Sequence, residues 1–194
     1  MSKTIFCYGD SNTYGYDPRG AFGGRYAPEN RWCELLAQRL SYHTVNFGED
    51  GRLIPTDQWS QDYLADRIRQ EKADLLLVML GSNDILLMDT PPEAVAKRLE
   101  SYLSRQQMEF PQLPILLLSP PQVSIPGFEG IMTNLASECA DVALRLHIPF
   151  VNTCQWNIPL AYDGVHFSEK GHHIFAEKLT AEIEKVIKSD IIDL

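Results

Sequence analysis

The chain has 194 residues, of which 44% are hydrophobic and 22% charged, a composition typical of a folded globular protein and unlike that of a disordered one. Its 17 basic and 26 acidic residues give a formal net charge of −9, which argues against a surface that binds nucleic acid or anionic lipid. The length predicts one domain over residues 1–194, and no apolar run approaches the roughly 18 residues of a membrane span.

Five short apolar runs predict the strands of a sheet. In these runs, apolar residues follow one another almost without alternation, as expected for parallel strands covered on both faces. The runs cover residues 4–8, 43–47, 75–80, 115–118 and 148–151.

Amphipathic stretches between these runs predict helices over residues 30–40, 57–72 and 131–146, with two more beginning near residues 90 and 168. Thr90 can cap the first of these two, with Pro91 in its first turn and Glu93 completing a capping box. Ser168 can cap the last helix. Within residues 57–72, Trp59, Tyr63, Leu64 and Ile68 stand at the spacing of one side of a helix.

Strands and helices alternate through the whole chain, which predicts a three-layer α/β/α fold with an open parallel sheet and helices on both faces. Five strands favour the flavodoxin-like order 2-1-3-4-5. Ligands bind in such folds at the loops that follow the carboxyl ends of the strands. The longest irregular stretches, 17–29 and 120–130, are rich in glycine and proline, and residues 189–194 are expected to form a short tail or a peripheral turn.

Polar motifs follow four of the five predicted strands. Since the carboxyl ends of parallel strands meet at one edge, these motifs bring together a serine, an Asp/His pair, an asparagine amide and glycine backbone. Acyl transfer from an ester needs a nucleophile, a base, a residue that orients the base, and donors to the oxyanion. The sequence therefore predicts a serine-hydrolase site. The motifs are Gly9-Asp10-Ser11-Asn12-Thr13, Gly48-Glu49-Asp50-Gly51, Gly81-Ser82-Asn83-Asp84 and Asp163-Gly164-Val165-His166.

These motifs resemble the sequence blocks of the SGNH or GDSL hydrolases, which include esterases, lipases, thioesterases and carbohydrate deacetylases. The resemblance extends over nearly the whole chain. The string from Cys7 to Pro18 is similar to the branch of arylesterases and lysophospholipase-type esterases, with Asn12 where the family name has leucine. The resemblance implies the SGNH hydrolase fold, hydrolysis of small acyl esters and no cofactor.

The same resemblance implies a role for each candidate residue. Ser11 is the expected nucleophile, His166 its base, and Asp163 the residue that orients His166. The expected oxyanion donors are the backbone amide of Ser11, the side chain of Asn83 and the backbone amide of a glycine in the second motif. Gly48 and Gly51 both qualify, and the surrounding string favours Gly51.

A flavin-binding electron carrier is an alternative from another class, because the same topology can hold a phosphate at a loop like residues 9–15. This alternative leaves Asn83 and the Asp163/His166 pair without a role. The carboxylate of Asp10 would also repel a phosphate.

Several polar residues near the motifs have simpler structural interpretations. Asp10 and Asp84 are expected to fix their loops by accepting backbone N–H bonds. His172 and His173 would suggest a metal site together with His166, but no cysteine or carboxylate stands at ligand spacing beside them, so we expect packing or surface roles and no metal.

Other features leave the biological setting partly open. The aromatic residues Tyr14, Tyr16 and Trp59 are expected either to line a pocket or to pack.

The four cysteines form no CxxC pair, which favours reduced, mostly buried thiols in a cytoplasmic protein. We expect a small-molecule ester as the partner, and the motifs fit a carbohydrate O-deacetylase, a lysophospholipase or a thioesterase equally well. Neither the natural ester nor the oligomeric state follows from the sequence.

Overall fold

A computed structural model describes residues 3–20, 22–128 and 130–188. Its five parallel strands lie in the order β2-β1-β3-β4-β5, which confirms the predicted fold class and strand order. The strands are β1 (Thr4–Gly9), β2 (His43–Gly48), β3 (Leu75–Met79), β4 (Ile115–Leu118) and β5 (Phe150–Val151). β5 is shorter than predicted because Pro149 has no N–H to donate to the ladder, although its carbonyl still accepts a bond from Leu117.

In the described part of the chain, five long helices cover the sheet, and two short ones directly follow strands. The long helices are α2 (Trp32–Leu40), α3 (Gln58–Glu71), α5 (Pro92–Glu109), α6 (Ile131–Leu146) and α7 (Glu169–Lys188). The short helices α1 (Ser11–Tyr14) and α4 (Ser82–Leu86) follow β1 and β3. Single 3₁₀ turns lie at η1 (Pro28–Asn30) and η2 (Thr153–Trp156). The helix predicted from residue 30 therefore begins two residues later, after η1.

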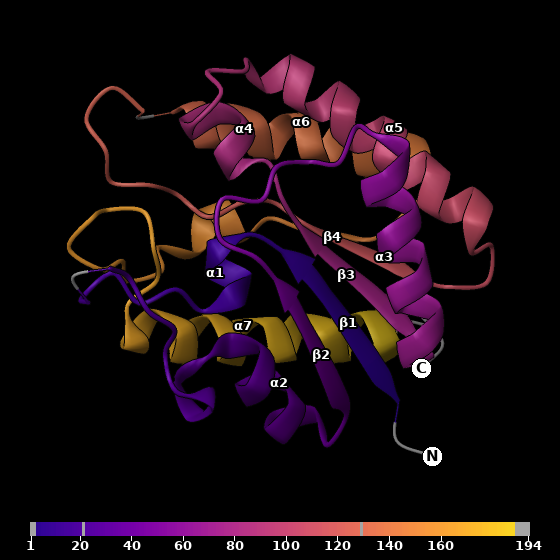
Figure 1. The fold of residues 1–194 in the computed structure, drawn as a ribbon, viewed down its shortest axis with the longest axis horizontal. Helices are drawn as coiled ribbons and strands as arrows, with labels where there is room; N and C mark the ends of the chain where they lie inside the picture. The colour runs from indigo at the N-terminus through magenta and orange to yellow at the C-terminus, as the bar shows by residue number, and fades with distance from the viewer. Residues whose placement is uncertain (1–2, 21, 129, 189–194) are drawn as a thin grey trace.

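The helices form two layers, with α3, α5 and α6 on one face of the sheet and α2 and α7 on the other (Figure 1). Successive residues of β1 point to opposite layers. Phe6 and Tyr8 pack in the core with α3, α5 and α6, whereas Ile5 and Cys7 pack with α2 and α7. Because both faces are buried, the strand sequence is apolar throughout rather than alternating.

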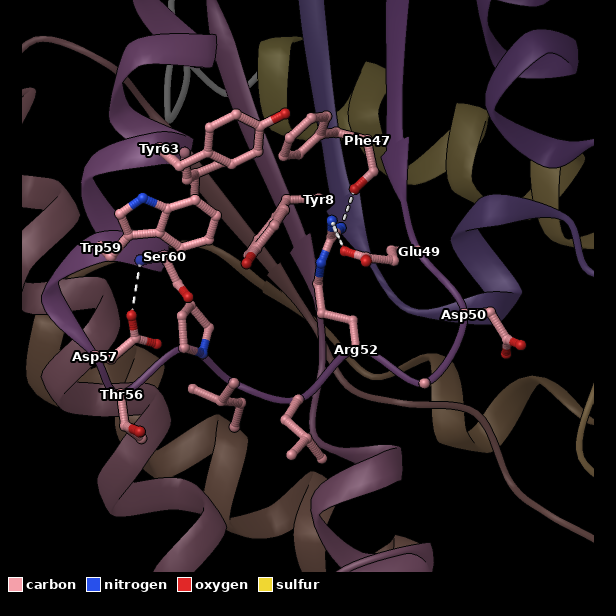
Figure 2. A pocket seen from close by; sticks show the side chains of 15 residues that line it. Tyr8, Phe47, Glu49, Asp50, Arg52, Thr56, Asp57, Trp59, Ser60 and Tyr63 are labelled. Atoms are coloured by element: carbon pink, nitrogen blue, oxygen red, sulfur yellow. Dashed lines mark hydrogen bonds and ion pairs between the residues drawn. The ribbon is translucent and has the colours of Figure 1, made fainter.

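The four residues that share one side of α3 in the sequence pattern are not equally buried in the structure. Leu64 and Ile68 are buried as expected, but Trp59 is 75% exposed and Tyr63 is 49% exposed. Their rings stack on each other with centroids 5.8 Å apart and an interplanar angle of 4°. The spacing put all four residues on one side of the helix, but Trp59 and Tyr63 line a cavity that the segment following β2 leaves beside α3 (Figure 2).

The start of α5 also differs from the prediction, because Pro91 rather than Thr90 occupies the N-cap position and no side chain caps the helix. Thr90 precedes a proline, which disfavours the helical region for it. Its backbone N–H instead bonds the carbonyl of Asp84.

At the start of α7, the prediction is confirmed: the Ser168 hydroxyl accepts the backbone N–H of Gly171 at 3.1 Å. All four cysteines are buried and free, as expected. The predicted tail at residues 189–194 lies outside the described residues. Among the helices that the structure describes, none has the length and apolar character needed to cross a bilayer.

Candidate active site

Ser11 is the first residue of α1 and lies directly at the end of β1. The Asp10 side chain caps this helix by accepting the backbone N–H of Asn12 at 3.0 Å. Gly15 ends the helix in the left-handed region, with φ of 88°. A sharp strand-to-helix turn thus presents the Ser11 side chain at the carboxyl edge of the sheet, where it is 4% exposed.

The Ser11 hydroxyl meets a histidine and an aspartate from the loop before α7. His166 Nε2 lies 3.0 Å from Ser11 Oγ, and His166 Nδ1 lies 2.6 Å from Asp163 Oδ2. The second oxygen of Asp163 accepts the backbone N–H groups of Val165 and His166, each at 3.0 Å. Burial acts to raise the pKa of Asp163, but its hydrogen bonds with His166 and with these backbone groups lower the pKa overall. The structure therefore brings the three predicted triad residues into one hydrogen-bonded chain around an ionised carboxylate.

Asn12 links the turn that carries Ser11 to the loop that carries His166, a role that the sequence did not indicate. Its side-chain oxygen accepts the backbone N–H of Phe167 at 2.8 Å, and its amide nitrogen donates to the carbonyl of Val165 at 3.2 Å. These two residues flank His166. The Asn12 carbonyl in turn accepts the indole N–H of Trp32 at 2.9 Å, and Asn12 is 3% exposed. Asn12 therefore fixes the backbone on both sides of His166 relative to Ser11.

Of the three aromatic residues left open by the sequence, one contacts the candidate triad. The ring of Tyr16 packs against the imidazole of His166 with centroids 4.5 Å apart. Tyr14 instead lies under the guanidinium of Arg25, at 4.3 Å. Trp59 lines the cavity beside α3.

The two glycines of the second motif have different surroundings. Gly48 ends β2, and its N–H donates to the Asn46 side chain at 3.1 Å. A Cβ at Gly48 would lie 2.1 Å from the backbone nitrogen of Tyr14, so glycine is required there for close packing against α1. Gly51 has φ of 70°, and a Cβ built there would meet no atom within 4 Å. Within the described part of the chain, the Gly51 N–H makes no hydrogen bond, which leaves it available to a ligand.

Asn83 and Asp84 lie side by side in α4 but make different contacts. The Asn83 side-chain amide donates to the carbonyl of Arg52 at 3.0 Å. Asp84 is fully buried and accepts the backbone N–H of Ile54 at 3.1 Å and the guanidinium of Arg98 at 2.9 Å. The prediction that Asp84 accepts a backbone N–H is confirmed, and the Asn12 N–H bond confirms the same prediction for Asp10.

Asp10 is a buried carboxyl in the turn that carries Ser11. Burial raises the pKa of Asp10 to about 6, although the bond from the Asn12 N–H and the nearby His166 act to lower it. The Asp10 carboxyl thus accepts a backbone N–H of this loop, of the kind that would otherwise donate to a bound phosphate.

His172 and His173, which the sequence grouped with His166, lie apart from this chain of hydrogen bonds. His172 is fully buried and accepts the backbone N–H of Trp32 at 3.4 Å, while His173 Nε2 lies 3.1 Å from the Asn30 side chain at the surface. In the residues that the structure describes, no three His, Cys, Asp or Glu side chains are grouped as metal ligands.

The chain matches the family model of the GDSL-like lipase/acylhydrolases over residues 7–174. No curated protein sequence matches it significantly.

Solved structures similar to the chain include hydrolases of related kinds. An aryl esterase from M. smegmatis is 27% identical, with 95% of this chain and 99% of that one covered and a TM-score of 0.80. A carbohydrate acetylesterase family member from Sinorhizobium meliloti is 25% identical, with 96% and 99% covered and a TM-score of 0.79. A lipase/acylhydrolase from Enterococcus faecalis shares the fold at 19% identity, with 94% and 96% covered and a TM-score of 0.74.

Proposed function

The chain belongs to the GDSL-like lipase/acylhydrolase family, and from this premise we propose that it is a carboxylic ester hydrolase whose nucleophile is Ser11. The observation that carries the proposal is the chain of hydrogen-bond contacts from Ser11 Oγ to His166 at 3.0 Å and on to Asp163 at 2.6 Å. Such a chain lets a weakly acidic hydroxyl lose its proton as it attacks.

In the proposed reaction, Ser11 Oγ forms a bond to the ester carbonyl carbon while His166 Nε2 takes the hydroxyl proton. The resulting imidazolium is stabilised by the Asp163 carboxylate. As the tetrahedral intermediate collapses, the bond to the alcohol breaks and His166 returns the proton to the leaving oxygen. Water then attacks the acyl-serine with the same base, releasing the acid and restoring Ser11.

The negative charge of the intermediate needs donors that are in place before the reaction. We assign this role to the backbone N–H groups of Ser11 and Gly51 and to the side-chain amide of Asn83. Gly51 is preferred to Gly48 because the Gly48 N–H already bonds Asn46. Each –NH₂ group carries two N–H donors, so the bond from Asn83 to the Arg52 carbonyl leaves one for the oxyanion.

The proposed substrates are small or short-chain acyl esters. O-deacetylation of a carbohydrate is a second candidate, supported by the similarity to the carbohydrate acetylesterase family member from Sinorhizobium meliloti. The family membership and the capping role of Asp10 both favour hydrolysis over the flavin-carrier alternative.

Hydrolysis of p-nitrophenyl acetate by the purified protein tests the proposal. The wild type and Ser82→Ala should release p-nitrophenolate, whereas Ser11→Ala should be slower by on the order of 10³ or more in kcat. Ser82 is the comparison, because it is an equally buried serine on the same edge of the sheet, but its side chain hydrogen-bonds the Asp10 carboxyl rather than a histidine. An inactive wild type, or an active Ser11→Ala, would overturn the proposal.

A further inference from the structure

Arg52 follows the proposed oxyanion donor Gly51, and its side chain extends into a cavity of about 490 Å³ between α3 and the segment after β2 (Figure 2). The lining of this cavity includes Gly51 but none of the three proposed triad residues. The Arg52 side chain is only 12% exposed, which is low for arginine. A charged group that is largely buried needs partners to offset its lost hydration.

The partners of the Arg52 guanidinium are the ends of two strands. One nitrogen donates to the carbonyl of Gly9, at the end of β1, at 2.9 Å, and also to the carbonyl of Phe47 in β2. The second terminal nitrogen of the guanidinium donates to the Glu49 carboxylate at 2.7 Å. The guanidinium carbon lies 4.6 Å from the ring centroid of Tyr8 and 5.0 Å from that of Phe47. Backbone bonds and aromatic contacts together fix this side chain against β1 and β2.

Two of the proposed oxyanion donors, Gly51 and Asn83, lie outside the turn that carries Ser11, and the backbone of Arg52 contacts both of them. Arg52 is covalently joined to Gly51, and its carbonyl accepts the side-chain amide of Asn83 at 3.0 Å. Gly51 has no side chain that could pack against a neighbour, and its backbone is in the left-handed region. Its own contacts therefore restrict the orientation of its N–H only weakly. The position of its N–H therefore depends on the anchored residue that follows.

We propose that Arg52 is a positioning residue, which holds the Gly51 N–H and the Asn83 amide at the place where the oxyanion forms. This inference rests on the proposed ester hydrolysis. Because the charge develops only in the transition state, a misplaced donor lowers kcat more than it raises KM. The planar fork of arginine can reach two carbonyls and a carboxylate at once, whereas lysine offers a single ammonium centre.

The contact with Glu49 contributes less than the backbone bonds. Glu49 is 67% exposed at its side chain, and exposed ion pairs contribute little. Glu49→Gln should therefore change kcat by less than about 3-fold, while loss of the guanidinium removes the bonds to both strand ends.

The test compares Arg52→Met, Arg52→Lys and Arg67→Met by steady-state kinetics on p-nitrophenyl acetate. Arg67 is the matched control, because it lies 5.8 Å from the same Phe47 ring but, among the residues that the structure describes, bonds Gln70 and Glu71 of its own helix and no strand. Arg52→Met should lower kcat about 10- to 100-fold with KM changed less than about 3-fold, and Arg52→Lys should fall between it and the wild type. Arg67→Met should stay within about 2-fold of the wild type. A folded Arg52→Met with wild-type kcat would overturn the proposal.

Inhibition by phenylboronic acid separates positioning from simple loss of folded protein. The boron adds to a serine hydroxyl and presents an oxygen to the oxyanion donors, so it mimics the tetrahedral intermediate. Its inhibition constant should rise in Arg52→Met by about the factor by which kcat/KM falls. An unchanged inhibition constant with a lower kcat would mean fewer folded molecules, and it would refute the positioning role.

Hydrogen exchange tests the same inference without any activity. The backbone N–H groups of Glu49 and Arg52 donate to the carbonyls of Gly9 and Glu49, and they should exchange at least about tenfold faster in Arg52→Met than in the wild type, whereas Arg67→Met should leave them unchanged. If the wild type hydrolyses no ester, the proposed function fails, and this measurement still decides whether Arg52 fixes the segment. Unchanged exchange in Arg52→Met would overturn the proposal.

Discussion

The side-chain amide of Asn83 donates a hydrogen bond of 3.0 Å to the backbone carbonyl of Arg52, which links α4 to the segment that contains Gly51. The bond fixes the plane of the amide and leaves its second N–H unused. Two proposed oxyanion donors, one in α4 and one in the segment after β2, are thereby held in one arrangement. Pre-organisation of this kind is what makes such donors effective, because they need not reorient as charge develops.

Removal of the Asn83 amide should impair the reaction without unfolding the protein. Asn83→Ala should lower kcat by about 10²–10³ with a smaller change in KM and a nearly unchanged Tm. Asn83→Asp should be at least as damaging, because an ionised carboxylate repels the developing negative charge. Steady-state kinetics and thermal melts of both variants check this expectation.

The neighbouring residue is the control for that experiment. Asp84 is fully buried and bonds the Ile54 N–H and Arg98, so Asp84→Ala leaves a backbone donor unsatisfied. Its main effect should be a loss of about 1–3 kcal/mol in the free energy of unfolding. Wild-type turnover in Asn83→Ala would exclude the proposed donor role.

Asn12 should act through the position of His166. Asn12→Leu, which restores the residue of the family name, removes both bonds to the backbone around His166 and leaves the buried Phe167 N–H without its acceptor. We expect kcat to fall about tenfold and the free energy of unfolding to fall by about 1–3 kcal/mol. Kinetics and denaturant melts measure the two effects. If Asn12→Leu matches the wild type in both, the two loops do not depend on this side chain.

The sequence predicted the sheet well because buried parallel strands are continuous apolar runs, which are visible without any long-range information. It missed α1 and α4, since helices of four and five residues are too short to show a period. It also did not separate the exposed Trp59 and Tyr63 from the buried Leu64 and Ile68, because spacing alone does not reveal whether a neighbouring segment covers the helix face.

The candidate site was predictable to the extent that its residues follow strands in recognisable motifs. Ser11, Asn83, Asp163 and His166 stand in such motifs, and the structure places His166 within hydrogen-bond distance of both Ser11 and Asp163. The proposed roles of Asn12 and Arg52 depend on long-range contacts. Asn12 bonds Val165, 153 positions away in the sequence, and Arg52 bonds Gly9, 43 positions away. Neither contact leaves a local pattern in the sequence, so only the structure could indicate them.

The stability of the protein should depend on the buried ring of His172. Burial lowers the pKa of His172 to about 3, so the folded protein keeps the ring neutral while the unfolded chain takes up a proton below about 6.5. The stabilising contribution is therefore present above that pH and is lost as the pH falls towards 3. As the pH falls from 7 to 4, the wild type should lose on the order of 3 kcal/mol relative to His172→Gln.

Urea melts of the two proteins at several pH values measure this difference. The raised pKa of Asp10 has the opposite effect, favouring the folded state as the pH falls, but it is common to both proteins and cancels in the comparison. Parallel stability curves for wild type and His172→Gln would show that this ring is not held neutral by burial.

Short acyl chains should be the better substrates. The segment bordering the proposed triad is held by polar contacts, with Tyr162 bonding the carbonyl of Pro18 and Arg19 bonding Asp17 and Glu169. Because the adjoining loops are only about a dozen residues long, we expect little apolar surface to cover a long chain. Acetyl to butyryl p-nitrophenyl esters should therefore have higher kcat/KM than the palmitoyl ester, and the reverse order would indicate a lipase.

The identity of the nucleophile is the central claim, and covalent labelling tests it most directly. A fluorophosphonate reacts with an activated serine by forming an O–P bond and releasing fluoride, and the adduct is located by mass spectrometry of peptides. We predict a single adduct, on Ser11, which is lost in Ser11→Ala and retained in Ser82→Ala. An adduct on Ser82, or no adduct on any serine of the folded wild type, would contradict the proposed mechanism.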